Sequence, residues 1–294
     1  MIPAQSQEPA VDAKKEAFRF VQALATELSS GKIELPSFPE VAMRIQRMLT
    51  DENVAADKIV RAIGAEPALA VRVLRMANSA ALNLSGRQVT ELRTAVARLG
   101  FNLLRSAAYS FIVAQVRQAA SLRKMDRQLL ALWEQSSTVA AICFVVARKY
   151  TQVNADSALL AGLLHGVGKL YILTRASNFP GLLSDPESYA QVESDWHANI
   201  ARALLENWEI AEEIVTAVQE FEEHDRDTRG PANVGDVLTA ATLLAEAQEK
   251  GDIAAVRFDG VKAWQRLGID RANCEEVMRE SATEIAALRG ALGA

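Results

Sequence analysis

Hydrophobic residues recur along most of this chain with the spacing of an amphipathic helix. Val41, Ile45, Met48 and Leu49 stand at positions i, i+4, i+7 and i+8, which places them on one helical face. No segment of any length alternates with the period of two that a half-buried strand requires. We therefore predict an all-α protein.

Helix start and stop signals divide the chain further. Gly31, Gly64 and Gly100 each follow a helical segment, where glycine ends a helix readily. Asn154 is placed to cap the helix that runs into His165. The expected helices include residues 12–30, 57–63, 90–99, 103–117, 126–150, 170–175, 186–207, 209–223, 234–250, 260–267 and 272–292.

Composition agrees with packed helices in a reducing compartment. Half of the 294 residues are hydrophobic and only 6% are aromatic, and two cysteines cannot form a disulfide framework. Cys143 lies in an apolar run and should be a buried packing residue. The longest such run, Val139–Ala147, is shorter than the ~20 residues of a membrane span. We expect a soluble cytoplasmic protein without membrane insertion.

Charge is distributed unevenly between the two parts of the chain. Residues 1–126 carry 17 Lys and Arg against 12 Asp and Glu, a net +5, and residues 127–294 carry 15 against 25, a net −10. The arginines are scattered over helices without a basic run or an aromatic platform, so nucleic-acid binding is not favoured. The acidic residues 220–227 are interpreted as a solvated helix end that could receive a basic partner.

One segment carries the remains of a chemical motif. Residues 158–170, Ala-Leu-Leu-Ala-Gly-Leu-Leu-His-Gly-Val-Gly-Lys-Leu, resemble the signature helix of the HD phosphohydrolase superfamily. That resemblance implies a metal-holding His-Asp pair, but here Gly166 follows His165. A carboxylate can bridge two cations, whereas glycine offers no ligand.

Three further blocks resemble the HDOD family, the HD-related output domain of bacteria. They are Leu35–Val41, with prolines at 36 and 39, then Glu66–Ala80 and Thr94–Arg105. The likeness runs from about Leu35 to about Gly230. It implies an all-helical, two-lobed domain of bacterial signal transduction that is not known for catalysis.

This resemblance suggests a division into three parts. We expect an N-terminal helical lobe over residues 12–125, an HD-like lobe over 126–250 and a C-terminal helical extension over 251–294. The second lobe should bury the residues Trp133, Ile142, Leu160, Leu163 and Leu164.

The HD-like lobe should also contain a degenerate cleft. The resemblance places six residues there: Gln135, His165, Gly166, His197, His224 and Asp236. Three histidines and an aspartate are an acceptable ligand set for a single zinc or iron ion, which remains an alternative. Hydrolysis further needs a metal-activated water, and the loss of a first histidine at Gln135 and of the Asp removes the means of holding a metal pair. We expect no catalytic residues, no bound metal and no cofactor.

Three functions compete on this basis. The favoured one is a non-catalytic signalling module that binds a regulatory or signalling protein. The alternatives are a sensor that binds a small nucleotide or anion in the degenerate cleft, and a residual phosphohydrolase. For the favoured function we expect recognition at the junction of the lobes, through Leu35–Glu40 and the turn after Asn78.

Overall fold

The computed structural model describes residues 8–31, 33, 44, 45, 47–49, 51, 53–227 and 229–293, with side chains from Lys14 onward. This part of the chain is helical and contains no strand, so the predicted all-α class is confirmed. The helices are α1 (Glu8–Ser30), α3 (Ala56–Gly64), α4 (Pro67–Ala77), α5 (Leu92–Gln118), α6 (Asp126–Tyr150), α7 (Ala155–Leu164), α8 (Val167–Ala176), α9 (Pro180–Leu183), α10 (Pro186–Asn207), α11 (Glu212–Glu220), α12 (Val234–Glu249), α13 (Ala263–Leu267) and α14 (Cys274–Leu292), with short 3-10 turns at Ala120–Met125 and Ile253–Ala255.

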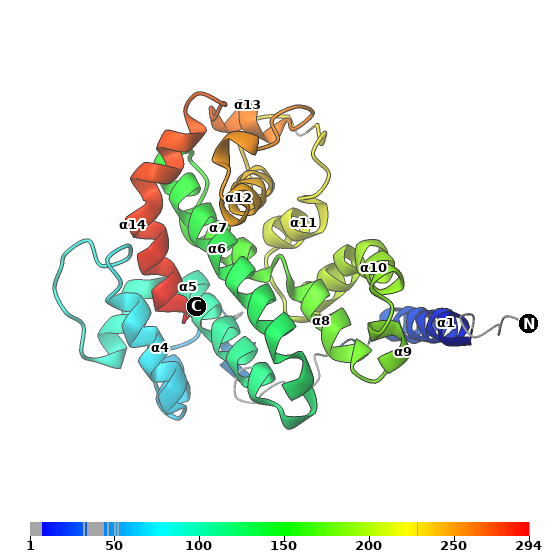
Figure 1. Cartoon of the computed structure of the whole chain (residues 1–294). Helices are drawn as coiled ribbons and strands as arrows, with labels where there is room; N and C mark the ends of the chain where they lie inside the picture. The colour runs from blue at the N-terminus through cyan, green and yellow to red at the C-terminus, as the bar shows by residue number, and fades with distance from the viewer. Residues whose placement is uncertain are drawn as a thin grey trace, which may run out of the picture.

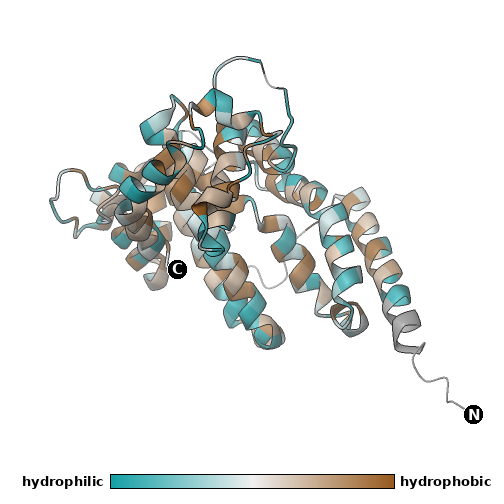
Figure 2. Cartoon of the chain, turned by 45° about the horizontal axis from the view of Figure 1, so that its top comes forward, coloured by the Kyte–Doolittle hydropathy of each residue, from teal (hydrophilic) through white to brown (hydrophobic). Residues whose placement is uncertain are grey.

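Helix α6 runs through the centre of the molecule, and α5, α7, α12 and α14 lie against it (Figure 1). Polar residues follow the outward faces of the surrounding helices (Figure 2). The predicted core residues of α6 and α7 are all buried, each at most 4% exposed: Trp133, Ile142, Leu160, Leu163 and Leu164. Burial also raises the pKa of the Cys143 thiol, in agreement with its expected packing role.

Two glycines allow neighbouring helices to touch at the level of their backbones. A Cβ atom at Gly162 would lie 2.5 Å from the Cα of Ala140, across the α6–α7 contact. A Cβ atom at Gly168 would lie 2.0 Å from the carbonyl oxygen of His197, across the α8–α10 contact. Only glycine fits at such approaches, because every other residue carries a Cβ. Gly168 lies in the first turn of α8.

Helices α3, α4 and α5 form the first lobe, at the lower left of Figure 1. Gly100, with φ of 68°, interrupts α5 at the point where the sequence predicts one helix to end and another to follow. Glycine adopts such a positive φ freely, whereas residues with a Cβ rarely do.

Helix α1 does not belong to the first lobe, which corrects the prediction for residues 12–125. It lies against α9 and α10 at the opposite end of the molecule (Figure 1). Phe20 contacts the ring of Phe179 edge-on at 5.1 Å between centroids, and Glu16 accepts a hydrogen bond of 2.6 Å from the N–H of Gly181. Aromatic burial and the capping of α9 together hold α1 there.

The C-terminal segment joins the two lobes. Helix α14 lies along α6, and its last turn reaches α4 (Figure 1). The guanidinium groups of Arg72 and Arg75 donate hydrogen bonds to the carbonyls of Leu292 (2.6 Å) and Gly290 (2.7 Å). Cations suit this position because the last carbonyls of a helix are unpaired and carry partial negative charge.

By length and composition alone, two stretches could cross a membrane, which the short apolar runs of the sequence did not indicate. They are Ala120–Tyr150 and Ala155–Ala176, and 67% and 94% of their most apolar windows are buried inside the structure. Core helices of a soluble protein pass the same test, so the finding is weak evidence for a membrane span.

The backbone contacts lead to a test of stability. Gly162→Ala and Gly168→Ala should each lower the free energy of unfolding by about 1 to 3 kcal/mol or more, because the added methyl group meets backbone atoms that cannot move independently. Gly290→Ala is the matched control, since a Cβ there has no neighbour within 4 Å. Urea unfolding measures all three, and equal effects at the three positions would contradict the packing argument.

Candidate functional site

The break between α7 and α8 holds His165 in a buried position. The ring is 4% exposed and stands edge-on to the ring of Phe221, at 5.6 Å between centroids. Its Nδ1 lies 2.6 Å from the carbonyl oxygen of Gly162, so Nδ1 carries the hydrogen and donates it. Metal-ligating histidines often show this orientation, with Nε2 left as the acceptor. The sequence motif thus keeps the ring geometry of a ligand.

The position after His165 is closely packed by side chains of α6. A Cβ atom at Gly166 would lie 2.9 Å from the Oγ of Ser136 and 3.2 Å from a methyl group of Leu132, both on α6. An aspartate would have to displace these side chains before it reached any cation. The side chains of Ser136 and Leu132 therefore pack directly against this position.

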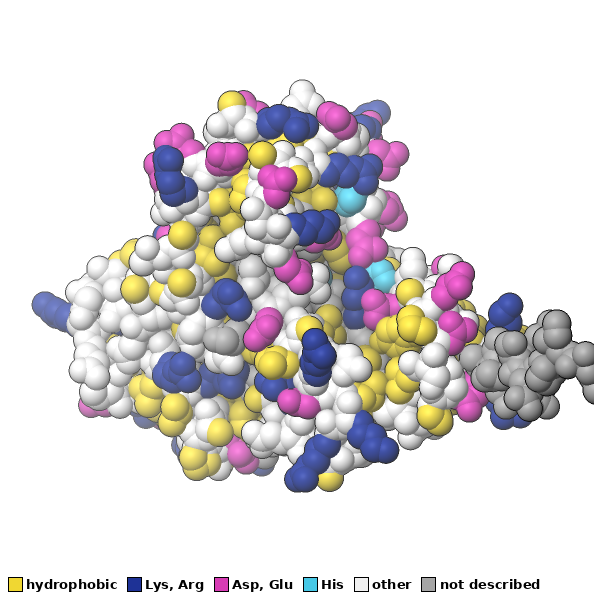
Figure 3. All heavy atoms as spheres, in the orientation of Figure 1, with side chains coloured by type: hydrophobic (Ala, Val, Ile, Leu, Met, Phe, Trp, Pro, Cys, Tyr) yellow, Lys and Arg dark blue, Asp and Glu magenta, His cyan; other side chains and the backbone are white. Residues whose placement is uncertain are grey.

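Charged side chains occupy the space beside His165. The Nε2 of His197 lies 3.1 Å from one carboxylate oxygen of Glu222, and the Nζ of Lys169 lies 3.6 Å from the other. The hydrogen bond with His197 is the main reason that the pKa of Glu222 falls to about 2. Acidic and basic side chains surround the histidines visible on the molecular face in Figure 3. This cluster of Lys169, His197 and Glu222 is called the charged cluster below.

Burial and charge both keep His165 neutral. Its removal from water lowers the pKa to about 4, and the positive charge of Lys169 acts in the same direction. The hydrogen bond to the Gly162 carbonyl and the charge of Glu222 oppose the shift but are outweighed.

Two of the expected cleft residues, Gln135 and His224, make other contacts. Gln135 is exposed on another face of α6, where it lines a pocket with residues of α12 and α14. His224 is half-buried beyond α11, and its carbonyl accepts a hydrogen bond from Lys262. The structure therefore brings His165, Gly166 and His197 together and corrects the placement of Gln135.

The buried carboxylate of Asp236 is bound at the start of α12. It forms a capping box with Asn233 at the start of α12 and binds Arg266 through both carboxylate oxygens, at 2.6 and 2.9 Å. Arg226 adds a contact of 3.2 Å. Burial opposes ionisation, but these hydrogen bonds and charges outweigh it and lower the pKa of Asp236.

The donor set does not fit a metal. In the part of the chain that the structure describes, no three His, Cys, Asp or Glu side chains are grouped to hold a metal ion. His197 already binds Glu222, Asp236 binds two arginines, and the ammonium of Lys169 brings a positive charge close to His165. A cation would have to compete with each of these partners.

The sequence motifs and this helical architecture agree with one family of domains. The family model of the HDOD domain matches residues 35–224, about two thirds of the chain. This chain belongs to the HDOD family.

Individual relatives are distant. An uncharacterised protein of Treponema pallidum (strain Nichols) is 25% identical over 213 residues, which are 67% of this chain but only 39% of that relative. The HDOD chain therefore spans about two fifths of the length of the curated relative that it matches.

Solved structures share the fold. One, from Shewanella amazonensis SB2B, provisionally named a metal-dependent phosphohydrolase, is 23% identical with a TM-score of 0.71 and covers 95% of this chain and 99% of its own. Another, a provisionally named signal transduction protein from Marinobacter aquaeolei VT8, is 21% identical with a TM-score of 0.57 and covers 99% and 68%. At these identities the likeness concerns the helical fold.

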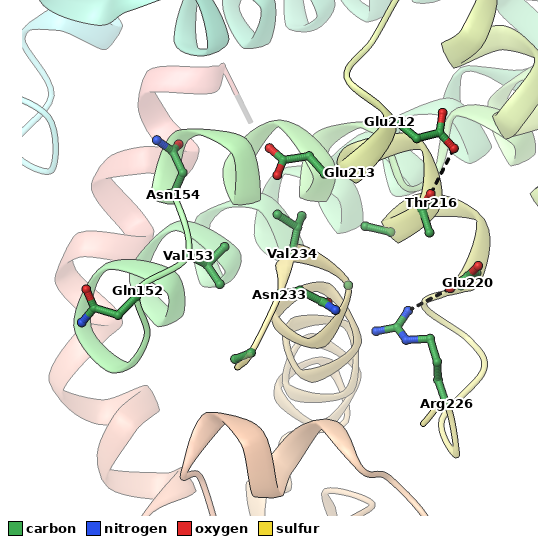
Figure 4. Close-up of a pocket in the computed structure, with 13 residues that line it drawn as sticks. Gln152, Val153, Asn154, Glu212, Glu213, Thr216, Glu220, Arg226, Asn233 and Val234 are labelled. Atoms are coloured by element: carbon green, nitrogen blue, oxygen red, sulfur yellow. Dashed lines mark hydrogen bonds and ion pairs between the residues drawn. The ribbon is translucent and has the colours of Figure 1, made fainter. Parts of the chain in front are cut away.

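A separate pocket of about 470 Å³ opens beside the HDOD core, between the α6–α7 loop, α11 and the start of α12 (Figure 4). Glu212, Glu213 and Glu220 line it, and Arg226 pairs with Glu220 at 3.7 Å. The excess of carboxylates makes this pocket unsuitable for an anion.

Two segments were predicted to take part in recognition, Leu35–Glu40 and the turn after Asn78. Leu35–Glu40 lies outside the described residues. The segment that follows Asn78 is a loop up to Thr90, closed at its base by two hydrogen bonds of 2.7 Å between the Asn78 side chain and the backbone of Val89. Near its tip Leu84 is 84% exposed.

The sequence reasoning missed Lys169 and Glu222. Lys169 lies four residues after His165, the spacing that brings side chains together on a helix, so its proximity was detectable. Glu222 was assigned to a solvated helix end, and only the approach of α10 turns that position into a partner for His197.

The low pKa of His165 predicts how stability changes with pH. As pH falls below the ordinary value of 6.5, the unfolded chain takes up a proton that the folded chain refuses until about pH 4. The free energy of unfolding should therefore fall by about 2 kcal/mol between about pH 6.5 and about pH 5, before Glu222 titrates.

Urea unfolding of the parent and of His165→Gln across this range measures the effect. The variant lacks the titrating ring, so its stability should change less with pH. An equal slope for both proteins would assign the pH dependence to other groups.

Proposed function

We propose that this HDOD chain is a non-catalytic bacterial signalling output module that binds a regulatory or signalling protein. It would act in the cytoplasm, without membrane insertion and without a cofactor. Its family membership and the signal transduction name of the Marinobacter aquaeolei neighbour fit a signalling module. The main support for the absence of catalysis is the charged cluster, in which His197 and Lys169 both bind the carboxylate of Glu222.

The chemistry of hydrolysis explains why this observation matters. A metal-dependent phosphohydrolase needs ligands that leave a coordination position open for water. Here Ser136 and Leu132 fill the space beside Gly166, and Lys169 places a positive charge near His165. Such an arrangement favours a packed interior over a reaction site.

Recognition would then depend on the surface. The loop from Ser79 to Thr90 combines an exposed Leu84 with the exposed cation of Arg87. Its base is bound to both lobes, because Arg98 of α5 donates to the Ala77 carbonyl and Arg148 of α6 donates to the Ala81 carbonyl. A preordered loop loses less conformational entropy on binding, which favours association.

The enzymatic alternative has a direct test. With Mg²⁺, Mn²⁺, Fe²⁺ or Zn²⁺ the purified protein should not hydrolyse cyclic dinucleotides or nucleoside phosphates. Metal-dependent turnover that disappears in His165→Ala would refute the proposal.

Restoring the motif should not restore metal binding. Gly166→Asp is expected to lose about 1 to 3 kcal/mol of stability through overpacking against α6, and to take up no metal in equilibrium dialysis. Gly166→Ala serves as the control for the added Cβ alone. Stoichiometric metal uptake by the aspartate variant would show that the cleft is still a working site.

Partner binding tests the surface proposal. Leu84→Asp should weaken association with a partner isolated from the source organism by about tenfold or more, since a buried leucine contact contributes on the order of 1.5 kcal/mol or more. Phe18→Asp is the control, because Phe18 is 71% exposed on α1, at the opposite end of the molecule. Calorimetric titration with the purified partner measures both, and equal binding by parent and Leu84→Asp would exclude the loop.

A further inference from the structure

A second pocket, of about 320 Å³, lies between α6, α12 and α14 and is separate from the charged cluster. This volume is within the range of small-molecule sites in proteins. The polar and charged side chains that line it are Glu134, Gln135, Thr138, Gln248, Glu249 and Arg289.

Arg289 is the unusual member of this lining. Its Nε is shielded from solvent and has no hydrogen-bond partner, and among the described residues no side chain pairs with its guanidinium. The Nε of Arg226 also lacks a partner, but the guanidinium of Arg226 binds Asp236 and Glu220. The Arg289 side chain is half-buried, and an Nε–H that is shielded from solvent without a partner is costly, because buried polar groups are normally hydrogen-bonded.

The other lining groups restrict what Arg289 could bind. Glu134 and Glu249 add two carboxylates, and the amides of Gln135 and Gln248 can both donate and accept hydrogen bonds. A phosphate dianion would meet two like charges, and a simple amine would leave Arg289 unsatisfied. A small molecule with one carboxylate and one ammonium group satisfies both kinds of charge.

We infer that this pocket binds a small zwitterion of the amino-acid class, with its carboxylate on Arg289 and its ammonium group toward Glu134 and Glu249. This inference goes beyond the proposed function and does not depend on it. It also assigns a role to Gln135, which the sequence resemblance had placed in the degenerate cleft.

A ligand in this pocket would lie next to the contact between α14 and the first lobe. Arg289 directly precedes Gly290, whose carbonyl accepts a hydrogen bond from Arg75 of α4. A ligand that fixes Arg289 therefore stabilises the turn of α14 that joins the first lobe. Amino-acid binding at this pocket would therefore change the contact between the lobes.

The experiment begins with the full chain and the standard L-amino acids at millimolar concentration, screened for a rise in melting temperature. The amino acid with the largest effect is then titrated calorimetrically, together with its deaminated acid and its decarboxylated amine. We expect the zwitterion to bind and each analogue to bind at least about tenfold more weakly.

Two variants test whether the ligand binds in this pocket. Arg289→Gln should weaken binding by at least about tenfold, and Gln135→Ala, at an exposed position that folding does not need, should weaken it several-fold. Arg279→Gln is the matched control on the same helix, since Arg279 is exposed and lies outside this pocket. Circular dichroism verifies that each variant folds.

Three results would overturn the inference. They are the absence of binding by every amino acid, unchanged binding in folded Arg289→Gln and Gln135→Ala proteins, and equal binding of the acid or amine analogue. Binding of inorganic phosphate alone would likewise identify an anion site instead. None of these results bears on partner binding at Leu84 or on hydrolysis, so this inference and the proposed function fail separately.

Discussion

Direct backbone contact between helices is the constraint on which the arrangement of this protein depends. Gly162 brings α7 onto α6, and Gly168 brings α8 onto α10 at the His197 carbonyl. His165 and Gly166 lie between these two contacts, so the same glycines that hold the core together also fix the former cleft. Because packed interiors resist changes of volume, these two contacts hold the geometry around His165.

The surroundings of His165 combine buried and charged side chains. His165 keeps the hydrogen bond and orientation of a ligand, whereas Lys169 and Glu222 supply charges from within the protein. The carboxylate of Glu222 is half-exposed, and it pairs with Lys169 and hydrogen-bonds His197 at the same time. Phe221 packs beside this region: its ring contacts His165, and its carbonyl accepts a hydrogen bond of 2.8 Å from Thr239.

Local signals in the sequence are sufficient for most of the helices. The bounds of α6 and α10 agree with the predicted segments, Asn154 caps α7 through the N–H of Ser157, and Gly100 marks the kink in α5. These features depend on residues within a few positions of one another, which a single sequence displays.

The site was less predictable because it depends on helix rotation and on distant contacts. A shift of one residue turns a side chain by about 100° on a helix, so Ser136 faces Gly166 while Gln135 points to another pocket. The packing of α1 on α9 and the arginine contacts of Asp236 join segments far apart in the chain, which periodicity does not reveal.

The closed base of the loop after Asn78 has an evolutionary consequence. Asn78 binds the backbone of Val89 at both its donor and its acceptor, so the loop is held by its ends and not by the residues at its tip. Substitutions near Leu84 would leave the helical scaffold intact while altering the surface that we propose to meet a partner. Related chains could therefore diverge in their partners by changing a few exposed positions, without redesigning the core.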